Sequence, residues 1–352
     1  MNTLDWHGCY DDGWTGLITP EAFAHPAKYA RGLIERIMRH GLEQGYWQAG
    51  DVLGDPFGGV ALGGVVAAYH GLAWVGVELE ERFVALGNEN IDLHRQKLEA
   101  LGAPIPRLLQ GDSRNFAQIC KGAAGVVTSP PFGIAQEGGG IRTSGVVHQK
   151  DGRVHKLRND GYQREKQGSS PGQIANLPPG DLKGVVTSPP YEGAETADAN
   201  SKRQADAGYW SKSTNKKLTG SYSVADYGAT DGQIGADAGD SYWRAMALVY
   251  AQCLQALKPG GVMAVVVKRY VKNKAIVELS DQTLQLLTHV GFQPLERVRA
   301  MLVKEHTTSG LFGEIKTTKA RKSFFRRLAE SHGSPPIDWE DVLFVKKSPH
   351  QK

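Results

Sequence analysis

Apolar residues near the start of the chain follow a strand–turn–helix–strand order. Val52 and Leu53 lead into a glycine-containing turn, and the small apolar stretch 60–70 reads as a helix that packs closely on a sheet. A second apolar strand, 73–77, ends at the acid Glu78. A glycine turn that opens a helix, with an acid about 20 residues further on, suits a nucleoside ligand, because a carboxylate then meets the ribose hydroxyls. The same pattern also fits an ordinary βαβ unit with a tight turn and a surface acid.

Strand-like and helix-like patterns alternate at both ends of the chain. Residues 1–20 show no clear period and are expected to be irregular, and the last strand, 341–345, is expected at an edge of the sheet. The alternation predicts an α/β fold with a doubly wound, mostly parallel sheet that a large loop-rich insertion interrupts. Helices are expected at 30–44, 60–70, 81–101, 114–121, 241–257 and 276–290, and the other strands at 107–113, 125–128, 184–187, 262–267 and 295–303.

One strand-and-turn segment occurs twice. Gly-Val-Val-Thr-Ser-Pro-Pro-Phe at 125–132 returns as Gly-Val-Val-Thr-Ser-Pro-Pro-Tyr at 184–191, which indicates an internal duplication. For a single copy, a proline turn that merely closes a strand is an adequate explanation. The stretches 133–180 and 192–238 are rich in Gly, Ser and Asn, and carry basic and aromatic residues. Long loops of this kind suit either contact with a polyanion or a solvated insertion.

Composition adds few constraints. At 352 residues the chain can bury one large core or two smaller ones, and 40% hydrophobic and 22% charged residues are ordinary for a globular protein. No apolar run approaches the ~20 residues that span a bilayer. The three cysteines, Cys9, Cys120 and Cys253, are far apart, which favours a reducing cytoplasm and argues against a metal site. A net charge of +4 permits a nucleic-acid partner without requiring one.

Taken together in this order, the motifs resemble the amino-group DNA methyltransferases, which use S-adenosylmethionine. His25-Pro26-Ala27-Lys28 is similar to the family's N-terminal HPxxK-type element, and Asp55-Pro56-Phe57-Gly58-Gly59 to its DPFxGxG cofactor loop, with Ala61 where a glycine is usual. The resemblance implies a Rossmann-like methyltransferase sheet. The cofactor-binding residues that it implies are His25, Lys28, Asp55, Pro56, Phe57, Gly58, Gly59, Glu78 and Asp112.

The Ser-Pro-Pro-aromatic turns resemble the family's catalytic [DNS]-P-P-[YFW] element. An exocyclic amine is a poor nucleophile, and a serine oxygen with the next proline carbonyl can accept both its hydrogens, while the aromatic ring stacks on a base taken out of the duplex. Only one copy can occupy the strand position beside the cofactor. The second is slightly favoured because it carries the commoner tyrosine, and the first has the shorter spacing from Asp112. The candidate catalytic residues are Ser188, Pro189, Pro190 and Tyr191, and their rivals Ser129, Pro130, Pro131 and Phe132.

The resulting hypothesis is a site-specific DNA methyltransferase that acts on double-stranded DNA. In the family that the sequence resembles, serine in place of aspartate in the catalytic turn is seen most with methylation of N4 of cytosine. The resemblance therefore favours N4 of cytosine over N6 of adenine as the methylated atom. A methyltransferase of RNA or of a protein amide, and a non-catalytic DNA-binding pseudoenzyme, remain as alternatives. No nuclease motif is evident, so methylation without cleavage is expected, and the oligomeric state, monomer or dimer, is open.

Three segments follow from this hypothesis. Residues 1–132 form the cofactor-binding half, 133–238 a loop-rich insertion for target recognition that contains the duplicated turn, and 239–352 the second half with a basic tail region. The DNA-binding candidates are Arg153, Lys156, Arg158, Lys319, Arg321, Lys322 and Arg326.

Overall fold

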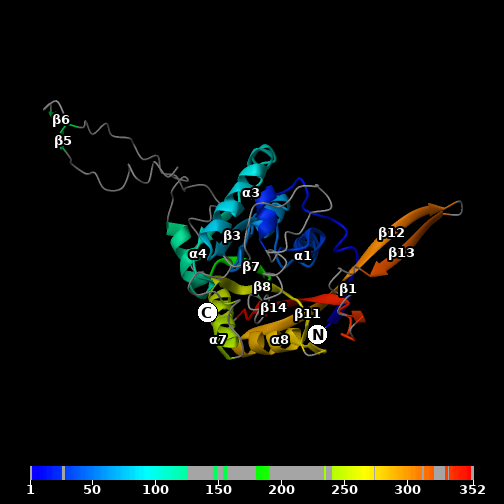
Figure 1. Cartoon of the computed structure of the whole chain (residues 1–352). Helices are drawn as coiled ribbons and strands as arrows, with labels where there is room; N and C mark the ends of the chain where they lie inside the picture. Colours follow the sequence, from blue (N-terminus) through cyan, green and yellow to red (C-terminus); the bar gives the residue numbers. More distant parts are fainter. Residues whose placement is uncertain are drawn as a thin grey trace.

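An eight-stranded sheet forms the centre of the computed structural model (Figure 1). The structure describes residues 2–25, 28–125, 146–148, 154–156, 180–190, 234, 240–272, 274–310, 313–320, 330–331 and 333–349. The strands of the sheet are β1 (Asn2–Trp6), β2 (Val52–Asp55), β3 (Ala73–Glu78), β4 (Arg107–Gln110), β7 (Leu182–Thr187), β8 (Leu257–Val267), β11 (Phe292–Met301) and β14 (Trp339–Lys347).

Helices cover both faces of this sheet. They are α1 (Arg31–Glu43), α2 (Leu62–Tyr69), α3 (Glu81–Ala100), α4 (Phe116–Gly125), α7 (Asp240–Ala256) and α8 (Leu279–Val290), with the short 3-10 turns η1 (Pro20–Ala24) and η2 (Ser113–Asn115). Among the described residues, no helix is both long enough and apolar enough to cross a membrane.

The strand order is β1-β11-β14-β8-β7-β2-β3-β4. Every neighbouring pair is parallel except the two that involve β14, which runs antiparallel to β11 and to β8. The chain builds outward from β2 through β3 to β4, then returns to the other side of β2 as β7. The predicted doubly wound, mostly parallel sheet is therefore confirmed, and its order reverses between β2 and β7.

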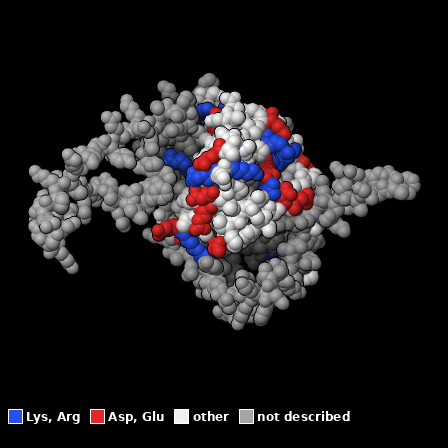
Figure 2. Space-filling view, turned by 90° about the horizontal axis from the view of Figure 1, so that it is seen from above, with Lys and Arg blue, Asp and Glu red and all other residues white. Residues whose placement is uncertain are grey.

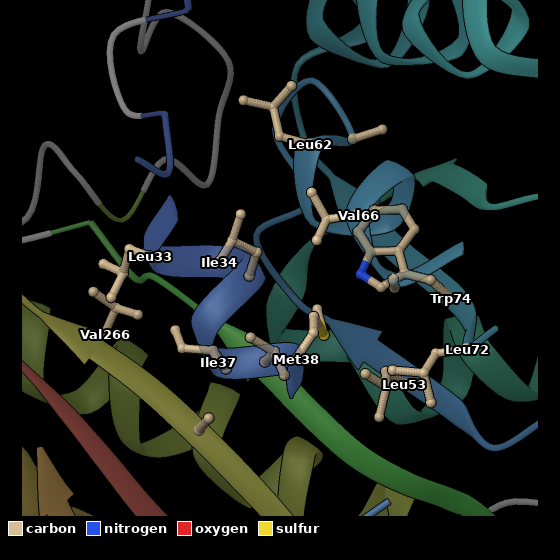
Figure 3. Close-up of a cluster of buried hydrophobic side chains, with 14 of the residues drawn as sticks. Leu33, Ile34, Ile37, Met38, Leu53, Leu62, Val66, Leu72, Trp74 and Val266 are labelled. Atoms are coloured by element: carbon tan, nitrogen blue, oxygen red, sulfur yellow. The ribbon is translucent and has the colours of Figure 1, made fainter. Parts of the chain in front are cut away.

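Alternating side chains of the sheet enter two separate apolar cores. In β8, Ala264 belongs to the core under α1, α2 and α3, while Val265 belongs to the core under α4, α7 and α8. Burial on both faces explains why this strand is a continuous apolar run in the sequence. Figure 3 shows one part of the first core, where apolar side chains of α1 and α2 meet those of the sheet: Leu33, Ile34, Ile37, Met38, Leu53, Leu62, Val66, Leu72, Trp74 and Val266.

Two sequence predictions about strands were wrong. The stretch 1–20 is not wholly irregular, since β1 pairs in parallel with β11, with Leu4 opposite Val298. The strand predicted at 341–345 is not at an edge, because β14 lies between β8 and β11. Its residues from Glu340 to Val345 are all buried, as a central strand requires.

Among the described residues, three two-stranded antiparallel pairs lie outside the main sheet. They are β5 (Val146–His148) with β6 (Val154–Lys156), β9 (Tyr270–Lys272) with β10 (Ala275–Val277), and β12 (Val303–Gly310) with β13 (Gly313–Ala320). The β12–β13 hairpin, which follows β11 in the chain, projects away from the sheet and its helices (Figure 1). The sequence indicated only a basic run at this place.

Candidate active site

The reversal of strand order between β2 and β7 defines the candidate site. In open α/β sheets, ligands bind outside the carboxyl ends of the strands at such a point. Leu53 of β2 is level with Gly184 of β7, so the register places Asp55, at the end of β2, level with Val186, two residues before Ser188. The loop that follows β2, residues 56–61, is called the glycine loop. It and the second Ser-Pro-Pro turn thus leave the same edge of the sheet from neighbouring strands.

The second copy of the repeat supplies the strand beside β2. Leu182–Thr187 is β7, and Ser188, Pro189 and Pro190 follow it as a half-buried turn. Segment 133–238, grouped above as an insertion, therefore contributes a strand to the main sheet. Tyr191 and the whole turn of the first copy, Ser129, Pro130, Pro131 and Phe132, lie outside the described residues.

Asp55 is a buried carboxylate, only 1% exposed. Its Oδ1 accepts a hydrogen bond from the Phe57 N–H (3.0 Å), and the Tyr29 hydroxyl donates to Oδ2 (3.4 Å). Burial raises the pKa of Asp55 to about 8, although the Phe57 amide and the Thr187 and Tyr29 hydroxyls favour its ionised form. Neither salt bridge nor hydrogen bond joins Asp55 to a cation among the described residues.

Glu78 holds the glycine loop from the next strand. Its Oε2 accepts from the Gly59 N–H and its Oε1 from the Glu80 N–H, both at 3.0 Å. Burial raises the pKa of Glu78, while these amide bonds act in the opposite direction. The Leu79 amide also favours the ionised form of Glu78, so three backbone N–H groups hold this carboxylate.

The glycine loop is packed too closely for larger residues at two positions. A Cβ on Gly58 would lie 2.5 Å from Leu108 Cδ1 and 3.3 Å from the Gly76 Cα, since the Gly58 N–H donates to the Val77 carbonyl (2.7 Å). Gly59 has φ +53°. Ala61, where the family that the sequence resembles has glycine, also has a left-handed backbone (φ 61°), which costs about 1 kcal/mol for a residue with a Cβ.

His25 lies beside the glycine loop, and Lys28 has a different role. His25 is buried against Phe83, with ring centroids 4.5 Å apart, and a Cβ on Gly59 would lie 3.2 Å from the His25 ring. The Lys28 ammonium donates to the carbonyls of Phe23 (2.9 Å) and His25, and burial lowers its pKa. Lys28 therefore binds the lead-in backbone, while His25 covers the glycine loop.

Asp112 is engaged by a neighbouring arginine. It caps η2 by accepting from the Arg114 N–H (2.8 Å), and the Arg114 guanidinium contacts both of its oxygens at 2.5 to 3.0 Å. Burial raises the pKa of Asp112, but the hydrogen bonds and charge of Arg114 outweigh burial and the net shift is downward. The next residue, Ser113, donates to the Pro56 carbonyl (2.5 Å) and so ties η2 to the glycine loop.

Sequence reasoning missed three residues that shape this site. Asn90, fully buried in α3, donates to the Val60 carbonyl (3.0 Å) and accepts from the Thr19 N–H (2.9 Å). Tyr29 reaches Asp55, and the Tyr242 hydroxyl reaches the Pro190 carbonyl. A polar side chain at a core-facing position of a helix, as Asn90 is, was the available signal.

The predicted DNA-binding residues are only partly described. Lys156 ends β6, and Lys319 lies on β13 in register with Lys304. On the face seen in Figure 2, described acidic and basic residues are intermingled around uncharged surface. Among the described residues, no group of His, Cys, Asp or Glu has a metal-binding arrangement. The remaining candidates, Arg153, Arg158, Arg321, Lys322 and Arg326, lie outside the described part of the chain.

The strand order decides the fold. Numbered in chain order from β2, the seven strands β2, β3, β4, β7, β8, β11 and β14 run 3-2-1-4-5-7-6 across the sheet, with the last strand antiparallel. This is the Rossmann-like methyltransferase fold. β1 extends it by one parallel strand beyond β11.

No protein-family profile matches the chain, and no curated protein does. Solved structures similar to it include the [4+2]-cyclase SpnF (11% identity, TM-score 0.40, 92% of this chain and 85% of that chain). A precorrin-6y C5,15-methyltransferase from Geobacter metallireducens is similar at 9% identity and TM-score 0.35 (90% and 88%). A TehB-like methyltransferase from Corynebacterium glutamicum is similar at 8% and 0.33 (90% and 87%). Similarity at these sequence identities and TM-scores gives no information about the activity of this protein.

Proposed function

We propose that the protein is an S-adenosylmethionine-dependent methyltransferase that modifies an exocyclic amine of a DNA base, N4 of cytosine ahead of N6 of adenine. The observation that carries the proposal is the pairing of two loops at one reversal of strand order. The glycine loop follows β2, and the Ser-Pro-Pro turn follows the adjacent β7. A cofactor loop and an amine-accepting turn in neighbouring positions are what methyl transfer to an amine requires.

The residues at the end of β2 and β3 fit the cofactor. Asp55 is a buried carboxylate whose charge no described cation balances, so a ligand ammonium would stabilise its ionised form. Glu78 lies at the carboxyl end of the adjacent β3, where a carboxylate suits a ribose diol. Gly58 and Gly59 let the backbone approach a ligand. The bound cofactor would supply an electrophilic methyl group on a sulfonium.

The turn after β7 fits the amine. Ser188 and the Pro189 carbonyl would accept its two hydrogens and turn the nitrogen lone pair toward the methyl group, because accepting both hydrogens weakens delocalisation into the ring. The Tyr191 ring would stack on the base. Proline restricts the turn, so the acceptors are held in place before the substrate arrives. The nitrogen becomes acidic only after transfer, and its proton can leave to water.

A nucleic-acid substrate is favoured by the charge of the segment between β11 and β14. Residues 302–338 contain seven Lys or Arg and four Asp or Glu, so +3 of the chain's formal +4 falls within this one segment. The segment includes the projecting β12–β13 hairpin (Figure 1). A segment with excess positive charge suits phosphate contacts, for which affinity falls steeply as salt increases.

The test is to incubate the protein with S-adenosylmethionine and either duplex DNA or RNA of mixed sequence, then digest the nucleic acid and identify methylated nucleosides by mass. N4-methylcytosine from DNA is the expected product. N6-methyladenine would change the base, and product from RNA alone would replace the substrate. Absence of any methylated nucleoside, from folded protein that binds the cofactor, would refute the proposal in favour of a protein substrate or a pseudoenzyme.

The duplicated turn offers a matched pair of variants. Ser188→Ala should lower kcat by about 100-fold, the scale for losing one preorganised polar contact in an active site. Ser129→Ala makes the same change in the same local sequence and should leave kcat within about twofold. The reverse result would transfer the catalytic role to the first copy, and no effect of either change would show that neither serine acts on the amine.

A further inference from the structure

A tyrosine of α7 forms a hydrogen bond with the Ser-Pro-Pro turn. The hydroxyl of Tyr242, in the first turn of α7, donates to the Pro190 carbonyl at 2.9 Å. The Tyr242 side chain is 2% exposed and packs at an angle against Trp243, with ring centroids 5.0 Å apart. Its hydroxyl therefore meets the turn from the face of the sheet that α7 covers.

Because of its two prolines, the turn depends on donors from other parts of the chain to fix its conformation. Pro189 and Pro190 have no backbone N–H, so neither can tie the turn through a hydrogen bond of its own amide. At the other end of the turn, Thr187 is fully buried and its hydroxyl favours the ionised form of Asp55. The turn is thus attached to the sheet through β7, which pairs with β2, and to α7 through Tyr242.

We propose that Tyr242 is a positioning residue for methyl transfer, an inference that rests on the proposed function. By binding the Pro190 carbonyl, its hydroxyl fixes the direction of the turn. The Ser188 oxygen and the Pro189 carbonyl then remain as the acceptors for the substrate amine. Tyr242 itself touches neither substrate nor cofactor in this role, and its effect passes through the turn.

A purely structural role for Tyr242 makes a different prediction. If the residue only filled the core, phenylalanine would fill it equally well, because the ring accounts for nearly all of the buried area. The substitution Tyr242→Phe removes the hydroxyl alone. Tyr250 provides the matched control, since it lies two turns further along α7 and is 1% exposed.

The experiment compares the wild type, Tyr242→Phe and Tyr250→Phe by two measurements. The first is amide hydrogen exchange of peptides spanning 184–192, followed by mass spectrometry. The second is steady-state methylation of duplex DNA, with the cofactor dissociation constant measured separately. For Tyr242→Phe we expect exchange in this peptide to rise at least threefold and kcat to fall about tenfold, with cofactor affinity within twofold. Tyr250→Phe should resemble the wild type in all three.

Each outcome decides a different point. Unchanged exchange in Tyr242→Phe would overturn the inference, because the hydroxyl would then not hold the turn. Faster exchange with an unchanged kcat would overturn the positioning role. If the wild type methylates nothing, the proposed function fails and the positioning role for methyl transfer is overturned with it, while the exchange data still report whether Tyr242 holds the turn.

Discussion

Replacing Asp55 by asparagine should stabilise the ligand-free protein at neutral pH. The pKa of Asp55 rises from 3.8 to about 8 on burial, so the folded state keeps a proton that the unfolded state has lost. The folded state binds more protons between these values, and the free energy of unfolding therefore falls as pH rises through that window. Asparagine has the same shape and does not titrate, so it escapes this loss.

The magnitude follows from the width of the window. Each pH unit between about 5 and 7 costs the wild type up to ~1.4 kcal/mol, so the advantage of Asp55→Asn should grow by up to about 2.7 kcal/mol over that interval. Comparing two pH values cancels any constant effect of the substitution. The assay is urea denaturation of wild type and variant at pH 5, 6 and 7, with Asp92→Asn, on the exposed surface of α3, as the control.

A difference that stays constant from pH 5 to pH 7 would refute the reasoning, because Asp55 would then be ionised in the folded protein. The same variant tests the ligand. If Asp55 binds the ammonium of the cofactor, binding at pH 7 should release up to one proton from the wild type. Asp55→Asn should release none, as calorimetry in buffers of different ionisation enthalpy can measure.

Three further substitutions test the packing of the site. Gly58→Ala should lower the free energy of unfolding by about 1–3 kcal/mol, measured in urea, because its Cβ would press on the Gly76 backbone; an unchanged value would mean that the loop moves freely. Asn90→Ala should lower it by about 2 kcal/mol and weaken cofactor binding, since the Val60 carbonyl loses its donor; full stability would disprove this link. Glu78→Gln should reduce cofactor affinity about tenfold by calorimetry while the fold, followed by circular dichroism, persists.

Much of the sheet was predictable because its strands are short apolar runs between turn residues. Strand β3 and helix α3 match their expected ranges almost residue for residue. The wrong prediction that β14 is an edge strand can be explained from its sequence. A continuous run such as Asp341-Val-Leu-Phe-Val345 is typical of a strand buried on both faces, yet its place near the end of the chain suggested an edge.

Other features depend on pairing that local sequence does not encode. The two copies of the duplicated turn have nearly the same residues, so only long-range pairing determines that Leu182–Thr187 lies beside β2. Strand β1 carries just two large apolar residues, Leu4 and Trp6, and exists because β11 offers it an open edge. Tyr242 and Pro190 are 52 positions apart, and no periodic pattern links them.

The antiparallel insertion of β14 between β8 and β11 has a consequence for synthesis on the ribosome. The strands β2, β3 and β4 can pair as soon as they emerge, but β8 and β11 become joined only after residue 347 has been made. Until then the apolar strand β8 and the strand β11 each present an open edge, and β1 must wait for β11, a partner almost 300 positions away. Between the completion of β8 at residue 267 and that of β14 at residue 347, the nascent chain is therefore only partly assembled, with exposed strand edges that can bind chaperones or the edges of other chains.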